Sequence, residues 1–87
     1  MFGIVTWFNI PKGYGEIYAE TGEVFFFTYH ALPKSTAFRV IERGQFVEFQ
    51  PSNDEYFGER KASKVSVVKK IPAKHLPKID QLKGVVR

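Results

Sequence analysis

The residues best suited to chemistry lie together near the N-terminus, in the segment Trp-Phe-Asn-Ile-Pro-Lys-Gly-Tyr-Gly-Glu. Trp7 and Tyr14 offer flat aromatic surfaces on which an unpaired base can stack, and Lys12 offers a cation for a phosphate. Gly13 and Gly15 have no side chains, so a nucleic-acid backbone can approach the ring between them. This combination indicates binding of single-stranded nucleic acid.

The other reactive side chains form no recognisable catalytic or metal-binding pattern. His30 and His75 lack neighbours at the spacing of metal ligands. The chain contains no cysteine, which excludes disulfides and thiolate metal sites. We therefore expect neither an enzyme nor a bound cofactor. No histidine and carboxylate constellation is evident around the serines, which are Ser35, Ser52, Ser63 and Ser66.

Composition also bears on where the protein works. A chain without cysteine fits the reducing cytoplasm. No apolar run approaches the roughly 20 residues that a membrane span needs. The N-terminus has no basic region ahead of an apolar stretch. We expect a soluble cytoplasmic protein with no membrane partner.

Length and charge divide the 87 residues into one domain and a tail. A chain of this size holds a single domain, near the lower limit for folding on a hydrophobic core alone. Residues 1–68 carry seven Lys/Arg and eight Asp/Glu, a net charge of −1, whereas residues 69–87 carry six and one, a net charge of +5. We expect a domain over residues 1–68 and a basic, proline-containing tail over residues 69–87.

The tail has two competing interpretations. Its cations, beginning with Lys69 and Lys70, suit phosphate contacts that add affinity without reading sequence. The alternative is a disordered, solubilising extension. A purely solvated tail is disfavoured by its apolar side chains, which can pack against the domain or a partner: Ile71, Leu76, Ile79, Leu82, Val85 and Val86.

Five short runs have the composition of β-strands and must position these residues: 2–9, 14–20, 23–29, 44–50 and 60–68. Tight turns join the first three, which should form an antiparallel meander. Pro51 and the polar residues after it should end the fourth run. Five strands without a convincing helix suggest a small closed barrel, because closure removes exposed sheet edges.

Such a barrel must place aromatic rings on both faces of its sheet. Phe25, Phe26 and Phe27 follow one another in one strand, so at least one must point outward or to an edge. An outward cluster of Trp7, Tyr14 and Phe26 on neighbouring strands would form a stacking platform for bases. Taken singly, each ring also fits the core of a β-protein.

Five segments, GIVTWFN, KGYGEI, VFFFTYHAL, RGQFVEF and ASKV, resemble the cold-shock domain in their order and intervals. The resemblance covers about residues 3–68 and is far more specific than the glycine motif alone. It implies an all-β, five-stranded antiparallel OB-type barrel that binds single-stranded RNA or DNA. It also implies polar or phosphate contacts from Asn9 and Lys12, and base stacking by Trp7, Phe8, Tyr14, Phe26, Tyr29 and, on the long loop, Phe38.

Three positions depart from the usual cold-shock pattern, and each loses a positive or stacking contact. Thr6 stands in place of the lysine before the tryptophan, and Thr28 in place of the histidine of the third strand. Glu16 stands in place of the second aromatic residue of the glycine motif. A carboxylate there cannot stack a base and repels phosphate. These changes leave the expected fold intact and lower the expected affinity.

Two other nucleotide-binding patterns fail on the order of their parts. An RNA-recognition motif shares Lys-Gly-Tyr-Gly but carries it on a late strand after a helix, whereas only eleven residues precede Lys12. A dinucleotide-binding loop would need a third glycine where Tyr18 stands, followed by a helix. The alternative that stays open is a protein-interaction module, a regulator or inhibitor whose altered face binds a protein partner or a second copy of the chain.

Overall fold

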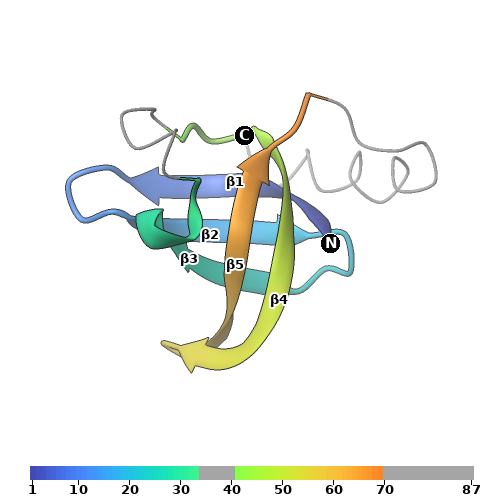
Figure 1. The fold of residues 1–87 in the computed structure, drawn as a ribbon. Helices are drawn as coiled ribbons and strands as arrows, with labels where there is room; N and C mark the ends of the chain where they lie inside the picture. Colours follow the sequence, from blue (N-terminus) through green and yellow to red (C-terminus); the bar gives the residue numbers. More distant parts are fainter. Residues whose placement is uncertain (34–40, 70–87) are drawn as a thin grey trace.

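The computed structural model describes residues 1–33 and 41–69, which form a closed five-stranded barrel (Figure 1). In this part of the chain, the only helical element is a 3-10 turn, η1 (Tyr29–Ala31), and no helix is long and apolar enough to cross a membrane. The expected all-β class is confirmed. The strands are β1 (Phe2–Asn9), β2 (Tyr14–Ala19), β3 (Val24–Thr28), β4 (Phe46–Tyr56) and β5 (Glu59–Val67).

Strand pairing closes the barrel in the order β1-β2-β3-β5-β4. β1, β2 and β3 form the predicted antiparallel meander, and β4 pairs antiparallel with both β1 and β5. The joint between β3 and β5 is parallel and short, with Phe25 opposite Arg60 and Phe26 opposite Lys61. Every strand therefore has two neighbours, and the OB-type barrel implied by the resemblance is confirmed.

The core follows the two-residue period of the strands. Phe25 and Phe27 are both fully buried, and Phe25 contacts Phe49 with ring centroids 4.9 Å apart. Phe26, between them, lies on the outer face, as the sequence required of at least one ring. All five strands contribute to the core, whose buried members are Val5, Ile17, Ala19, Phe25, Phe27, Ile41, Val47, Phe49, Ala62 and Val65.

A β-bulge in β1 decides which of its side chains point outward. The register between β1 and β2 shifts between Val5 and Trp7, so Thr6 is an extra residue in the ladder. Val5 is therefore fully buried, whereas Trp7 points outward and is 37% exposed. Phe8 turns back inward and stacks on Phe27, with ring centroids 5.4 Å apart. Without the bulge, Val5 and Trp7 would share a face.

β4 is longer than the sequence predicts. We expected it to end at Pro51, but it continues to Tyr56, and Pro51 pairs with Ala62 of β5. The ladder is irregular between Pro51 and Glu55, which is where a residue without an amide hydrogen is tolerated. The extended β4–β5 hairpin reaches past β3 in Figure 1. Its tip comes to the outer face that carries Phe26.

Arg60, next to the tip of this hairpin, ties the hairpin to the rest of the barrel. Its Nε donates a hydrogen bond to the carbonyl oxygen of Ser52 at 3.1 Å, and its Nη1 lies 3.3 Å from Oε1 of Glu23. The guanidinium carbon also lies 5.3 Å from the centroid of the Phe25 ring. The ion pair is half exposed and contributes little by itself, so the cation–π contact and backbone bond carry much of the anchoring.

Candidate nucleic-acid interface

Four rings from four strands lie side by side on the outer face of the barrel, and we call them the aromatic row: Trp7, Tyr14, Phe26 and Tyr56. Trp7 meets Tyr14 edge-on at 5.6 Å between ring centroids, and Tyr14 meets Phe26 at 5.4 Å. Phe26 and Tyr56 stack at 4.7 Å with 22° between their planes. The structure thus brings together the predicted cluster of Trp7, Tyr14 and Phe26.

Strand register produces this row. Glu16 of β2 lies directly between Trp7 of β1 and Phe26 of β3. Tyr14, two residues away on the same face, is diagonal to both rings. Diagonal neighbours across strands remain within reach of large aromatic side chains. The small carboxylate of Glu16 and the large ring of Tyr14 therefore both lie on the outer face of β2, between β1 and β3.

Glu16 is bonded to the row rather than standing apart from it. Nε1 of Trp7 donates a hydrogen bond to Oε1 of Glu16 at 2.7 Å. The hydroxyl of Thr6 donates to the backbone carbonyl of Glu16 at 3.3 Å. Two of the residues that depart from the usual pattern thus contact each other, and one of them fixes the orientation of the tryptophan ring.

A second carboxyl group lies beside Glu16. Burial, a hydrogen bond with Glu16 and repulsion from the Glu16 carboxylate raise the pKa of Glu59 from 4.5 to about 7. Glu59 is the first residue of β5, at the tip of the long hairpin. Glu59 therefore holds its proton up to near neutral pH, and its hydrogen bond with Glu16 joins the hairpin to the centre of the face.

Phe26 lies on the predicted face, but its ring is covered. It is only 4% exposed, because Tyr56 stacks on it and Phe57 meets it edge-on at 6.0 Å. Tyr56 is 47% exposed and Phe57 80% exposed. The surface open to a ligand at this end of the row is therefore made by the hairpin. The sequence signal for it was an aromatic pair directly before Gly58, within an otherwise polar stretch.

The glycines of the Lys-Gly-Tyr-Gly motif serve packing within the chain. A Cβ on Gly13 would collide with the ring of Tyr29, and Gly13 also adopts a left-handed φ of 72°. A Cβ on Gly15 would collide with the carbonyl oxygen of Trp7 and with Phe8. These glycines therefore let the Tyr29 ring and β1 pack closely against the Lys-Gly-Tyr-Gly segment. Their expected role in admitting a nucleic-acid backbone stays a prediction.

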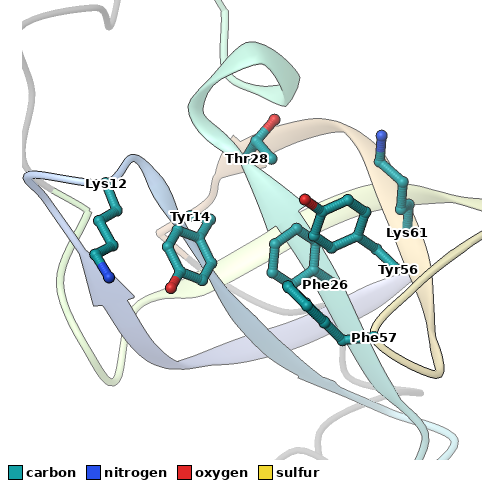
Figure 2. Close-up of a pocket in the computed structure, with 7 residues that line it drawn as sticks. All are labelled: Lys12, Tyr14, Phe26, Thr28, Tyr56, Phe57 and Lys61. Carbon is teal, nitrogen blue, oxygen red and sulfur yellow. The ribbon is translucent and has the colours of Figure 1, made fainter.

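Asn9 and Lys12 hold the β1–β2 turn. The backbone amide of Lys12 donates to Oδ1 of Asn9 at 3.0 Å, and the amide of Gly13 donates to the carbonyl of Asn9 at 2.7 Å. The side-chain oxygen of Asn9 is thus engaged in the turn. The side chain of Lys12 extends beside Tyr14 (Figure 2).

The other predicted contacts occupy different positions. Phe8 faces Phe27 on the core side, and Tyr29 is 55% exposed beside Gly13, where it stacks on His30 at 4.3 Å. Lys69 follows the far end of β5, away from the hairpin tip, and is exposed. Phe38, Lys70 and the rest of the tail lie outside the described residues.

A pocket of about 360 Å³ opens at the hairpin end of the row (Figure 2). The pocket walls come from β2, β3, the β1–β2 turn and the hairpin, and they consist of Lys12, Tyr14, Phe26, Thr28, Tyr56, Phe57 and Lys61.

In the described part of the chain, no group of three His, Asp or Glu side chains is placed to hold a metal ion.

Comparison with known proteins agrees with the barrel. Residues 1–69 match the model of the 'Cold-shock' DNA-binding domain. The chain is 36% identical over 67 residues to the major cold shock protein of Streptococcus pyogenes serotype M6, which covers 77% of this chain and 92% of that protein. It is also 42% identical to the probable cold shock protein A of Mycobacterium tuberculosis over 48 residues. These residues cover 55% of this chain and 72% of that protein. The chain belongs to the cold-shock DNA-binding domain family, whose members bind nucleic acids.

Proposed function

We propose that this protein binds single-stranded RNA or DNA by stacking unpaired bases on the accessible rings of the aromatic row, which are Trp7, Tyr14 and Tyr56. The observation that carries the proposal is the contiguity of the rings, whose centroids lie 4.7 to 5.6 Å apart from β1 through β2 and β3 to the end of β4. Stacking of this kind is worth about 1–3 kcal/mol per base and tolerates any sequence, because every base has a π-face.

Phosphate contacts would come from cations at both sides of the row. Lys12 and Lys61 flank it, whereas Glu16 places a carboxylate at its centre. The barrel therefore relies on stacking more than on charge, and phosphate attraction is left largely to the tail, beginning with Lys69 and Lys70. A cysteine-free chain suits the reducing cytoplasm, which we propose as the compartment.

Fluorescence of Trp7, the only tryptophan, tests the proposal. Titration with oligo-dT or oligo-U at low salt should quench it through stacking. Trp7→Ala, followed by anisotropy of a labelled oligonucleotide, should weaken binding by about 1–3 kcal/mol. Val67→Ala is the matched control, because Val67 is also a partly exposed apolar residue but lies at the far end of β5.

The absence of both quenching and anisotropy change would refute the proposal. In that case the face would serve a protein partner or a second copy of the chain. Sedimentation of the wild-type protein and of Trp7→Ala would identify the second copy, since loss of the ring would then lower the molecular mass in solution.

A further inference from the structure

We propose that the barrel carries a second interaction surface and that the chain's own tail, residues 70–87, docks on it. This surface, which we call the N-terminal patch, consists of Phe2, Ile4, Tyr18, Phe46 and Val68. It lies on the outer side of β1, β2 and β4, at the other end of β1 and β2 from the aromatic row. Docking there is independent of nucleic-acid binding.

Strand register places Ile4 at the centre of the N-terminal patch. Ile4 of β1 lies opposite Tyr18 of β2 on one side and opposite Phe46 of β4 on the other. Side chains of directly opposed residues share a face of the sheet. Val5, the next residue, points into the barrel, so Ile4 points away from the interior. Ile4 is nevertheless only 1% exposed, so the outer face holds a second packing centre that is separate from the barrel core.

The tail leaves the barrel at the N-terminal patch. Val68, directly after β5, packs against Ile4, and its backbone amide donates a hydrogen bond to the carbonyl oxygen of Phe46 at 2.9 Å. The residues that follow Lys69 therefore start beside the apolar side chains of the patch. A segment tethered this closely has a high effective concentration at the surface, so few contacts are needed for docking.

The sequence of the tail suits an apolar surface. Ile79, Leu82 and Val86 follow one another at intervals of three and four residues, which is the spacing of one face of a helix. A helix this short is marginal in water and needs packing to be stable. The three aromatic rings of the N-terminal patch are each partly exposed, so the patch offers apolar area for such a face to cover.

Charge favours the tail over other occupants. Two carboxylates lie beside Phe2: the Glu20 side chain accepts a hydrogen bond from the Phe2 amide at 2.8 Å, and the exposed Glu48 lies opposite Phe2 on β4. Residues 70–87 carry five Lys/Arg and one Asp, a net charge of +4 that complements these carboxylates. A nucleic-acid strand would instead bring phosphates toward them, and the same patch of a second copy, packed symmetrically, would bring like charges together. The tail's cations outnumber the two carboxylates, so docking leaves some of them for phosphate contacts.

A spin label on the tail of the full-length chain tests the docking. Because the chain has no cysteine, Gly84→Cys provides a single site for a nitroxide. Proton–nitrogen correlation spectra are recorded without nucleic acid. The nitroxide should broaden the amide signals of Ile4 and Tyr18 and leave that of Tyr56, near the hairpin tip, sharp.

Two substitutions in the tail separate docking from a general effect of charge. Leu82→Asp should abolish the broadening, because it places a carboxylate on the apolar side of the tail. It should also lower Tm by roughly 4–8 °C, a measurable shift in a domain of this size. Gln81→Asp is the matched control, since it introduces the same group at the neighbouring residue, outside the apolar spacing. It should leave both the broadening and Tm unchanged.

Sharp signals for Ile4 and Tyr18 in the spin-labelled protein would overturn the proposal, as would equal changes in Tm for Leu82→Asp and Gln81→Asp. A mixed sample identifies docking on a second copy: isotope-labelled protein without the nitroxide is combined with nitroxide-labelled protein of natural isotope abundance. Undiminished broadening in this mixture would assign the tail to another molecule and overturn docking within the chain. None of these measurements uses an oligonucleotide, so their failure would leave the proposed function standing.

Discussion

At the centre of the face, the Glu16 carboxylate accepts a hydrogen bond from the indole of Trp7, and its neighbour Glu59 bonds to Glu16 in turn. From the sequence alone, Glu16 was a lost stacking ring and a source of repulsion. The structure adds a positive role, because the bond restricts rotation of the Trp7 ring. A stacking ring held in place loses less entropy on binding, which offsets part of the repulsion between Glu16 and phosphate.

The raised pKa of Glu59 gives the fold a pH dependence near neutrality. The folded protein holds this proton up to about pH 7, whereas the unfolded chain releases it near pH 4.5. The folded state therefore binds more protons in that window, and the free energy of unfolding decreases as pH rises. The stabilising contribution is complete below pH 4.5 and lost once the pH passes 7. We expect Tm, measured by circular dichroism, to fall between about pH 5 and pH 8.

Glu59→Gln isolates this group, because the amide can still donate a hydrogen bond to Glu16 but cannot ionise. The variant should lose most of the change in Tm over this range. Glu48→Gln removes an exposed carboxylate elsewhere on the barrel and should keep the wild-type profile. Identical profiles for Glu59→Gln and the wild type would show that the proton is bound elsewhere.

Single residues differed in how far the sequence could place them. Tyr14 was predictable from its place in the glycine motif, and Trp7 from the resemblance to the cold-shock domain, although the bulge that turns Trp7 outward was not. The stacking of Tyr56 over Phe26 was not predictable, because Tyr56 is distant in sequence and lies beyond Pro51, which was expected to end the strand. The internal packing role of Gly13 and Gly15 also depended on neighbours, Tyr29 and Phe8, that only the folded chain brings close.

At the scale of the elements, β3 presents three phenylalanines with two distinct roles. Phe27→Ala should cost about 3–5 kcal/mol of unfolding free energy, because it leaves a cavity in a closed core. Phe26→Ala should cost less, about 1.5–3 kcal/mol, because the hairpin rings above it can settle into the space. Urea unfolding followed by circular dichroism measures both. Equal costs for the two variants would mean that Phe26 is a core residue and the hairpin is fixed over it.

The strands show why their existence was easier to predict than their ends. β1 begins and ends where the alternation and the turn residues indicated. β4 continues past its expected end to Tyr56, because Pro51 lies where the ladder to β5 is irregular and so removes no essential hydrogen bond. The bulge at Thr6 was also beyond the sequence pattern, although it alone explains how Val5 and Trp7 reach opposite faces.

At the scale of the whole molecule, charge and stacking are divided between two parts of the chain. Residues 1–68 carry a net charge of −1, whereas residues 69–87 carry +5. The aromatic row belongs to the first part, and the excess of positive charge belongs to the second. If the tail contacts a bound strand, it supplies most of the counterion release, and the barrel supplies most of the stacking.

Ending the chain after Lys69 tests this division, because the match to the cold-shock family also ends there. The truncation removes Lys70, Lys74, Lys78, Lys83 and Arg87. Each phosphate contact contributes about 0.7 to the slope of log affinity against log salt for a single strand, so loss of three to five contacts should flatten the slope by roughly 2 to 3.5. Trp7 quenching at saturation should remain, since the rings are untouched. An unchanged slope would exclude the tail as a phosphate contact, and unfolding of the truncated protein would instead make the tail's apolar residues part of the packed structure.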